Sequence, residues 1–154
     1  MKISAHLDLS EVTRSDSAKR NGIDNTPTPE HLENFKLLAE KVFEPIRLHF
    51  NTPIFISSGY RSKELNTFIK GSLSSQHCKG QAIDIDMDGT KGGVTNKMVF
   101  DFIKDKLEFD QLIWEFGTDA NPDWVHVSYA KGANRKQKLK AVRNNGKTSY
   151  INLP

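Results

Sequence analysis

Ten residues near the middle of the chain, 75–84 with the sequence SQHCKGQAID, place a histidine and a carboxylate where a turn leads into a strand-like run. Zinc accepts imidazole nitrogen and carboxylate oxygen, and a catalytic zinc site has three protein ligands with a fourth position open to water. His77 and Asp84 are therefore two candidate ligands. Of the other histidines, only His126 lies inside a second strand-like run, at 124–129, so it is the first candidate for the third ligand.

Both strand-like runs alternate in a way that would bring these ligands together. In the run 82–87 the isoleucines share one face and Asp84 lies on the other. In the run 124–129 the two valines share one face and His126 lies on the other. Gly80 permits a tight reversal before the first run. The alternation predicts that the ligands lie on the polar face of one sheet.

A calcium site is the alternative suggested by Asp84, Asp86 and Asp88, which are spaced like the first ligands of an EF-hand loop. The twelfth position of that loop requires a bidentate glutamate, and here it is Thr95. We therefore expect no calcium at this loop and expect the second and third aspartates to be solvated. Cys78, next to the first histidine, is expected to point away from the metal.

The elements around the ligands predict an α+β fold. A long amphipathic helix begins after Thr28 and carries apolar residues at helical spacing to residue 46, with Pro45 expected to kink or break it. A second helix is predicted from about residue 95 to 107. The runs 111–117 and 124–129 predict an antiparallel hairpin. We expect a small antiparallel sheet that holds the zinc site and packs against helices, with the first 27 residues wrapping the surface.

Length and charge suggest one domain over residues 1–154 with a basic C-terminal tail or hairpin at 131–154. The tail has seven basic and no acidic residues, so with a net charge of +3 the rest of the chain carries −4. The Asn-Asn-Gly turn at 144–146 predicts a hairpin whose lysines protect a sheet edge. A nucleic-acid surface is the alternative, but the charges are not interleaved with base-stacking aromatic residues, so no nucleic-acid partner is expected.

No apolar run approaches the ~20 residues of a membrane span, and the N-terminus lacks the apolar stretch of a signal peptide. We expect a monomer that does not associate with membranes. It would be cytoplasmic when synthesised and would reach its target outside the cell only after release.

The pattern Ser-x-His-x-x-Gly-x-Ala-x-Asp is formed by Ser75, His77, Gly80, Ala82 and Asp84. It resembles the signature of the zinc D-alanyl-D-alanine peptidases, a family whose fold is shared with the hedgehog amino-terminal domain. The runs 58–62 (SGYRS) and 124–128 (WVHVS) are also similar to runs of this family, in the same order. The resemblance extends from Leu9 to Tyr129 and is greatest to small phage and bacterial cell-wall peptidases. It implies that the two ligands of the signature and His126 hold zinc.

A hydrolytic zinc site also needs a base that passes a proton from water to the leaving amine. The resemblance places the family's acid/base, often a glutamate and in some endopeptidases an aspartate, at Asp123, three residues before His126. Glu115, on the opposite strand of the predicted hairpin, is the alternative base or an acceptor that orients a ligand. Arg61 is expected to bind a substrate carboxylate or to stabilise the oxyanion. Ser75 is expected to bind substrate or to hold the ligand loop.

Position 124 is a tryptophan where some carboxypeptidase members carry a histidine, so a mechanism that uses that histidine is not expected. We predict zinc-dependent hydrolysis of peptide bonds in peptidoglycan stem peptides. The enzyme would be either a D-Ala-D-Ala carboxypeptidase or an endopeptidase that cuts L,D or D,D bonds. The alternative is a catalytically silent module of the same fold that binds the cell wall or forms part of a phage particle.

Overall fold

In the computed structural model, which describes all 154 residues, six strands form one sheet in the order β1-β2-β4-β3-β5-β6. The strands are β1 (Ile56–Ser58), β2 (Ala82–Ile85), β3 (Gln111–Glu115), β4 (Trp124–Ser128), β5 (Gln137–Asn144) and β6 (Lys147–Asn152). Neighbouring strands are antiparallel except for β3 and β5, which are parallel. The predicted α+β class and the β3–β4 hairpin are confirmed. The sheet is larger than predicted, and its parallel pair was not predicted.

The helices are α1 (Leu9–Thr13), α2 (Asp16–Arg20), α3 (Pro29–Leu38), α4 (Glu44–Phe50), α5 (Lys63–Phe68) and α6 (Asn96–Lys106), with a π-helical turn η1 (Ala39–Phe43) and a 3-10 turn η2 (Gln76–Lys79). Thr28 caps α3 as predicted, with its hydroxyl accepting from the backbone of His31. The helix does not end at Pro45. Because proline lacks an N–H, the chain widens into η1 just before it and then continues as α4 to Phe50.

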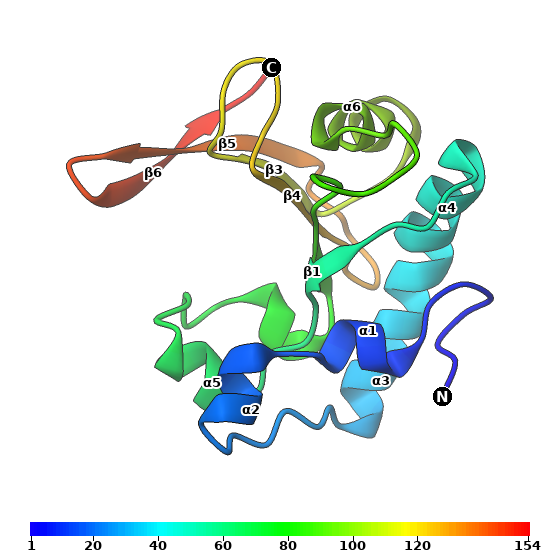
Figure 1. Cartoon of the computed structure of the whole chain (residues 1–154), viewed down its shortest axis with the longest axis vertical. Coiled ribbons are helices and arrows are strands. Elements are labelled where there is room, and N and C mark those ends of the chain that lie inside the picture. Colours follow the sequence, from blue (N-terminus) through cyan, green and yellow to red (C-terminus); the bar gives the residue numbers. More distant parts are fainter.

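The main core lies between one face of the sheet and the helices α3, α4 and α6, which lie on the same side of it (Figure 1). The predicted alternation is confirmed, since Ile83, Ile85, Val125 and Val127 are fully buried in this core. The N-terminal segment does more than wrap the surface. Its Val12 is fully buried in the same core, and the Val12 carbonyl accepts from the backbone N–H of Tyr60.

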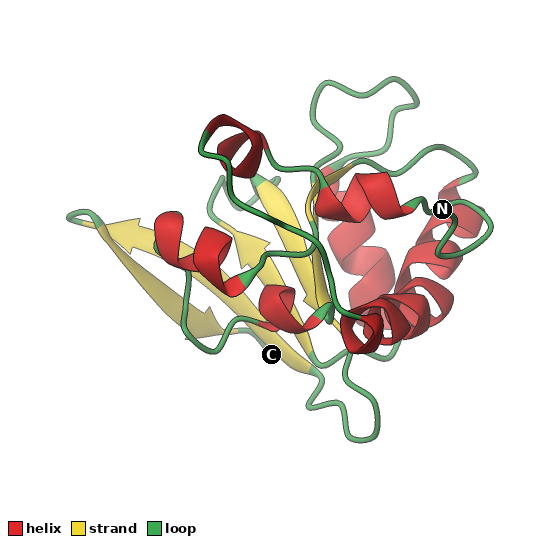
Figure 2. Cartoon of the chain, turned by 90° about the horizontal axis from the view of Figure 1, so that it is seen from below, coloured by secondary structure: helices red, strands yellow, loops and turns green.

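The other face of the sheet carries the polar residues and continues into the β5–β6 hairpin, which extends away from α3, α4 and α6 (Figures 1 and 2). The predicted turn is confirmed, because Asn145 and Gly146 both have positive φ, as a two-residue hairpin requires. A small second cluster of Ile113, Leu139 and Ala141 is buried on this face. None of the helices combines the length and apolar character needed to cross a membrane.

Candidate metal centre

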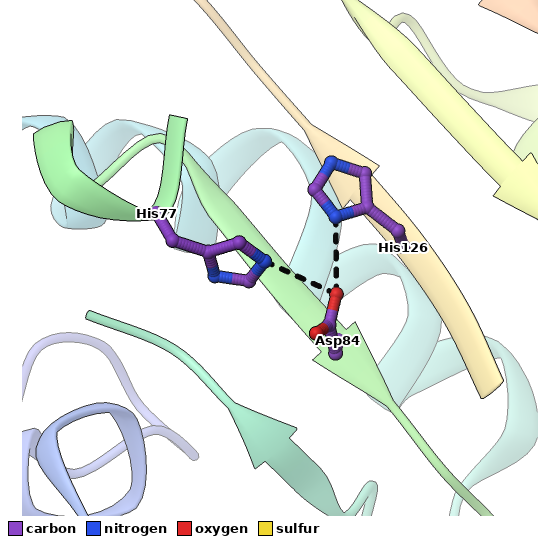
Figure 3. A group of neighbouring side chains, drawn as sticks. All are labelled: His77, Asp84 and His126. Carbon is purple, nitrogen blue, oxygen red and sulfur yellow. Dashed lines mark hydrogen bonds and ion pairs between the residues drawn. The ribbon is translucent and has the colours of Figure 1, made fainter. Parts of the chain in front are cut away.

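Three elements position the predicted ligands. His77 lies in η2, and the Ser75 hydroxyl caps this turn by accepting from the backbone N–H of His77 at 3.2 Å. Gly80 ends this turn with φ +72, a conformation that suits glycine, and returns the chain to β2. Asp84 on β2 then lies directly opposite His126 on β4 in the strand register. The local turn and the strand pairing together make the three side chains converge (Figure 3).

The three ligand atoms form one cluster. Oδ1 of Asp84 lies 3.2 Å from Nε2 of His77 and 3.0 Å from Nδ1 of His126. All three side chains are buried, and their candidate ligand atoms lie within 4.8 Å of one another. Cys78 and the two further aspartates of the loop are not part of this cluster. The structure therefore brings together the three residues that the sequence singled out.

The protonation of His77 explains why this cluster suits a cation. Its Nδ1 lies 2.6 Å from the carbonyl oxygen of Gly59, and because a carbonyl only accepts, Nδ1 carries the proton. Burial lowers the pKa of His77, which favours the neutral ring. Its Nε2 then carries no proton, and its lone pair faces Oδ1 of Asp84 at a distance of 3.2 Å. Two acceptors this close repel each other unless a cation lies between them.

The carboxyl group of Asp84 is ionised, as a metal ligand must be. Burial alone would raise the pKa of Asp84, but positive charge beside it, on the two imidazoles when they are protonated or on a metal ion bound in place of those protons, outweighs burial and holds this pKa well below its usual value. Nε2 of His126 is buried without a hydrogen-bond partner, so the protein does not use the full bonding capacity of that ring. Two imidazoles and one carboxylate are the donor set that zinc accepts with a fourth position open. The residues fit a zinc ion.

A cavity of about 590 Å³ lies beside the three ligands. Arg61, Ser75 and Glu115 line it together with the ligands, whereas Asp123 does not. This volume falls within the range of about 300–1,000 Å³ that is typical of small-molecule sites. Of the two residues expected as a base, only Glu115 borders this space.

Glu115 is a buried carboxylate at the end of β3, only 8 % exposed. Burial raises the pKa of Glu115 to about 7; the nearby His126 and Arg61 charges lower it and the Asp84 carboxylate raises it further. A carboxylate with this pKa exchanges a proton readily near neutral pH. The geometry and the acidity of Glu115 both suit a general base.

Asp123 lies on the turn just before β4, and its side chain is exposed. Its backbone N–H donates to the Glu115 carbonyl at 2.9 Å, and its own carbonyl accepts from the Asn96 side chain at 3.0 Å. These two bonds fix the backbone, while the carboxylate has no hydrogen-bond or ion-pair partner. The structure therefore leaves Asp123 outside the cavity, although it is only three residues from His126.

Arg61 is held at the cavity wall beside the ligands. Its Nη2 lies 3.7 Å from Oδ2 of Asp84, and its Nη1 donates to the side-chain oxygen of Asn66 at 3.3 Å. Asn66 is itself buried and donates to the carbonyl of Ser72 at 2.8 Å, so it ties the arginine to the loop that leads to His77. No local sequence pattern identifies Asn66 as a site residue, because only the folded chain places α5 beside the loop that leads to His77. The guanidinium faces the cavity with the metal ligands.

A comparison with known protein families identifies a match over the part of the chain that contains these residues. A family model described as Peptidase M15 matches residues 5–128, which include the three candidate ligands, Arg61 and Glu115. A search of curated proteins found no match to the chain. The family match covers most of the sequence and includes every element that builds the metal centre. The chain belongs to the peptidase M15 family.

Proposed function

We propose that the protein is a zinc-dependent peptidase that cleaves peptide bonds in peptidoglycan stem peptides. The observation that supports it best is the pair of facing acceptors, Nε2 of His77 and Oδ1 of Asp84, at the edge of a cavity that also contains a buried carboxylate. His77, Asp84 and His126 would hold the zinc ion. When bound, zinc polarises a peptide carbonyl and lowers the pKa of water.

Glu115 is proposed as the general base. Its carboxylate would take a proton from the attacking water and pass it to the leaving amine, and a pKa of about 7 allows both steps near neutral pH. Asp123 remains the alternative suggested by the family resemblance. Its exposed side chain would have to turn into the cavity when substrate binds.

Arg61 is proposed to stabilise the oxyanion that forms as water attacks the carbonyl. Its guanidinium is largely buried, with a side chain 17 % exposed, so its charge is only weakly screened by water. The hydrogen bonds to Asn66 and Ser58 hold it in place before substrate arrives. Donors fixed in advance lower the cost of developing negative charge.

Mass spectrometry of purified peptidoglycan after digestion tests this function and identifies the bond that is cut. The zinc-loaded wild type should release peptide fragments, and His77→Ala should lose both zinc and activity. Glu115→Gln should retain zinc and lose about 10²- to 10⁴-fold in rate, the range expected for a missing general base. Asp123→Asn is the matched control and should stay close to the wild type.

Two results would contradict parts of the proposal. If Asp123→Asn were inactive and Glu115→Gln active, the base would be Asp123. If the wild type held one zinc ion per chain but released nothing from several peptidoglycan types, the protein would be a catalytically silent module of this fold.

A further inference from the structure

The face of the sheet that carries the metal ligands continues into the β5–β6 hairpin. Glu115 on β3 pairs with Ala141 on β5, and Ala141 pairs with Tyr150 on β6. In the neighbouring row, Ile113 pairs with Leu139. Three of these residues, Ile113, Leu139 and Ala141, form the small buried cluster on this face, and the first two also line the cavity. The hairpin therefore extends the floor of the site.

Part of the cavity wall comes from residues after 128, where the family match ends. These lining residues are Arg135, Leu139, Arg143, Thr148 and Tyr150. Tyr150 lines the same cavity as Glu115 and Asp84. The basic hairpin is thus a wall of the catalytic cavity as well as a sheet edge.

The charges of the cavity are arranged unevenly. Its carboxylates are Asp84 and Glu115, both in the centre of the site. Its basic residues are Arg61, Lys70, Arg135 and Arg143. The first and third of these are paired with aspartates, whereas Lys70 and Arg143 form no ion pair. Lys70 and Arg143 therefore bring positive charge without an ion-pair partner to the lining of the cavity.

The exposed side chain of Arg143 lies over an aromatic ring. Its guanidinium carbon lies 4.5 Å from the centroid of the Phe116 ring, and that ring contacts Trp124 edge-on, with centroids 5.6 Å apart. Stacking over an aromatic ring orients the guanidinium plane, and its N–H groups donate to no protein acceptor. A planar fork of free donors matches the two oxygens of a carboxylate.

We propose that the β5–β6 hairpin is a specificity wall of the active site and that Arg143 binds a carboxylate of the peptide substrate away from the scissile bond. The inference deepens the proposed function and rests on it. Stem peptides offer such groups in the α-carboxylate of a γ-linked glutamate and in the terminal carboxylate. The wall would favour substrates in which that group is free and charged.

Three synthetic stem pentapeptides test this: a parent with free carboxylates, one amidated at the glutamate α-carboxylate and one amidated at the C-terminus. One of the two amidations should lower kcat/KM of the wild type about tenfold, as loss of a charged hydrogen-bond pair does. Arg143→Gln should abolish that penalty. Lys147→Gln removes the same charge from the same hairpin outside the cavity, and this control variant should retain the amidation penalty.

If Arg143→Gln kept both amidation penalties at their wild-type size, the inference would be overturned. Should the wild type cleave none of the peptides, the proposed function would fail by itself, and calorimetric titration with the same peptides would then decide. Tighter binding of the free carboxylate that disappears in Arg143→Gln would support the wall. Equal binding of all three peptides would refute it.

Discussion

Nδ1 of His77 donates to the carbonyl oxygen of Gly59 across 2.6 Å, and this bond determines which nitrogen of the ring faces Asp84. Gly59 follows β1, and its own packing is tight, because a Cβ at this position would lie 2.5 Å from the carbonyl oxygen of Val12. The ring orientation of His77 is therefore set by the Gly59 backbone, which packs against α1 and follows directly after β1. Such outer partners commonly tune metal affinity by about 10- to 100-fold.

The ligand assignment predicts one zinc ion per chain. Asp84→Asn and His126→Ala should each weaken zinc binding by more than the roughly 100-fold that loss of an outer partner costs. His49→Ala is the matched control, since this histidine is exposed and stacks on Phe102 far from the cluster. Metal analysis after dialysis would measure the stoichiometry. Full zinc content in the Asp84 variant would exclude the assignment.

Gly80→Ala should destabilise the protein because it affects the turn between the first two ligands. An added Cβ would lie 2.4 Å from the backbone oxygen of His31, and the residue has φ +72. Gly22 has φ +61 with nothing near it, so Gly22→Ala isolates the conformational cost of about 1 kcal/mol. We expect Gly80→Ala to exceed this control by a further ~1–3 kcal/mol in urea unfolding. Equal losses would mean that the turn adapts without strain.

The raised pKa of Glu115 predicts a pH-dependent stability in the metal-free protein. The folded state keeps a proton on this carboxyl between its ordinary pKa of 4.5 and about 7, whereas the unfolded state releases it. The free energy of unfolding of the wild type, relative to Glu115→Gln, should be highest below pH 4.5 and fall as pH rises through 7. The difference should be about 3 kcal/mol. Urea melts at several pH values in the presence of a chelator would measure it, and a flat difference would show that Glu115 titrates normally.

Asp110 should matter for stability because it joins three segments. It is only 4 % exposed and accepts from Arg135 through Nη2 at 2.8 Å and from Gln76 of η2 at 3.0 Å. Removing the carboxylate leaves these donors without a buried partner, so Asp110→Ala should cost about 2–3 kcal/mol. Asp119→Ala breaks a pair with Lys140 whose carboxylate is fully exposed, so water screens it and its loss should cost much less than that of Asp110. Thermal unfolding of both variants would measure the two losses in stability, and equal losses would contradict this ranking.

Two of the three candidate metal ligands could be predicted from local sequence. His77 and Asp84 are seven residues apart in one signature, and the alternation of β2 and β4 decides which face each side chain takes. The turn of the β5–β6 hairpin could be predicted for the same reason, since Asn145 and Gly146 define its conformation. These features depend on near neighbours in the chain.

The positions of Asp123 and Glu115 relative to the cavity depend on contacts between residues far apart in the sequence. Asp123 is close to His126 in sequence, but Asn96 of α6 and the register against β3 fix its backbone and leave the side chain outside the cavity. The parallel pairing of β3 with β5 likewise joins residues far apart in sequence. Neither contact has a local pattern, so the part of the hairpin in the cavity wall could not be predicted.

A sheet with its helical core on one face and its reactive groups on the other assigns alternate residues to different selective pressures. In β2 and β4 the odd-numbered residues are buried against helices, and the cavity is lined from even-numbered positions by Asp84, Trp124 and His126, while in β3 the parity is reversed. A deep mutational scan should therefore show a two-residue rhythm. Substitutions on the core face would lower abundance, and those on the cavity face would lower activity at normal abundance. Residues that contact substrate could therefore change while the core that stabilises the fold stays the same.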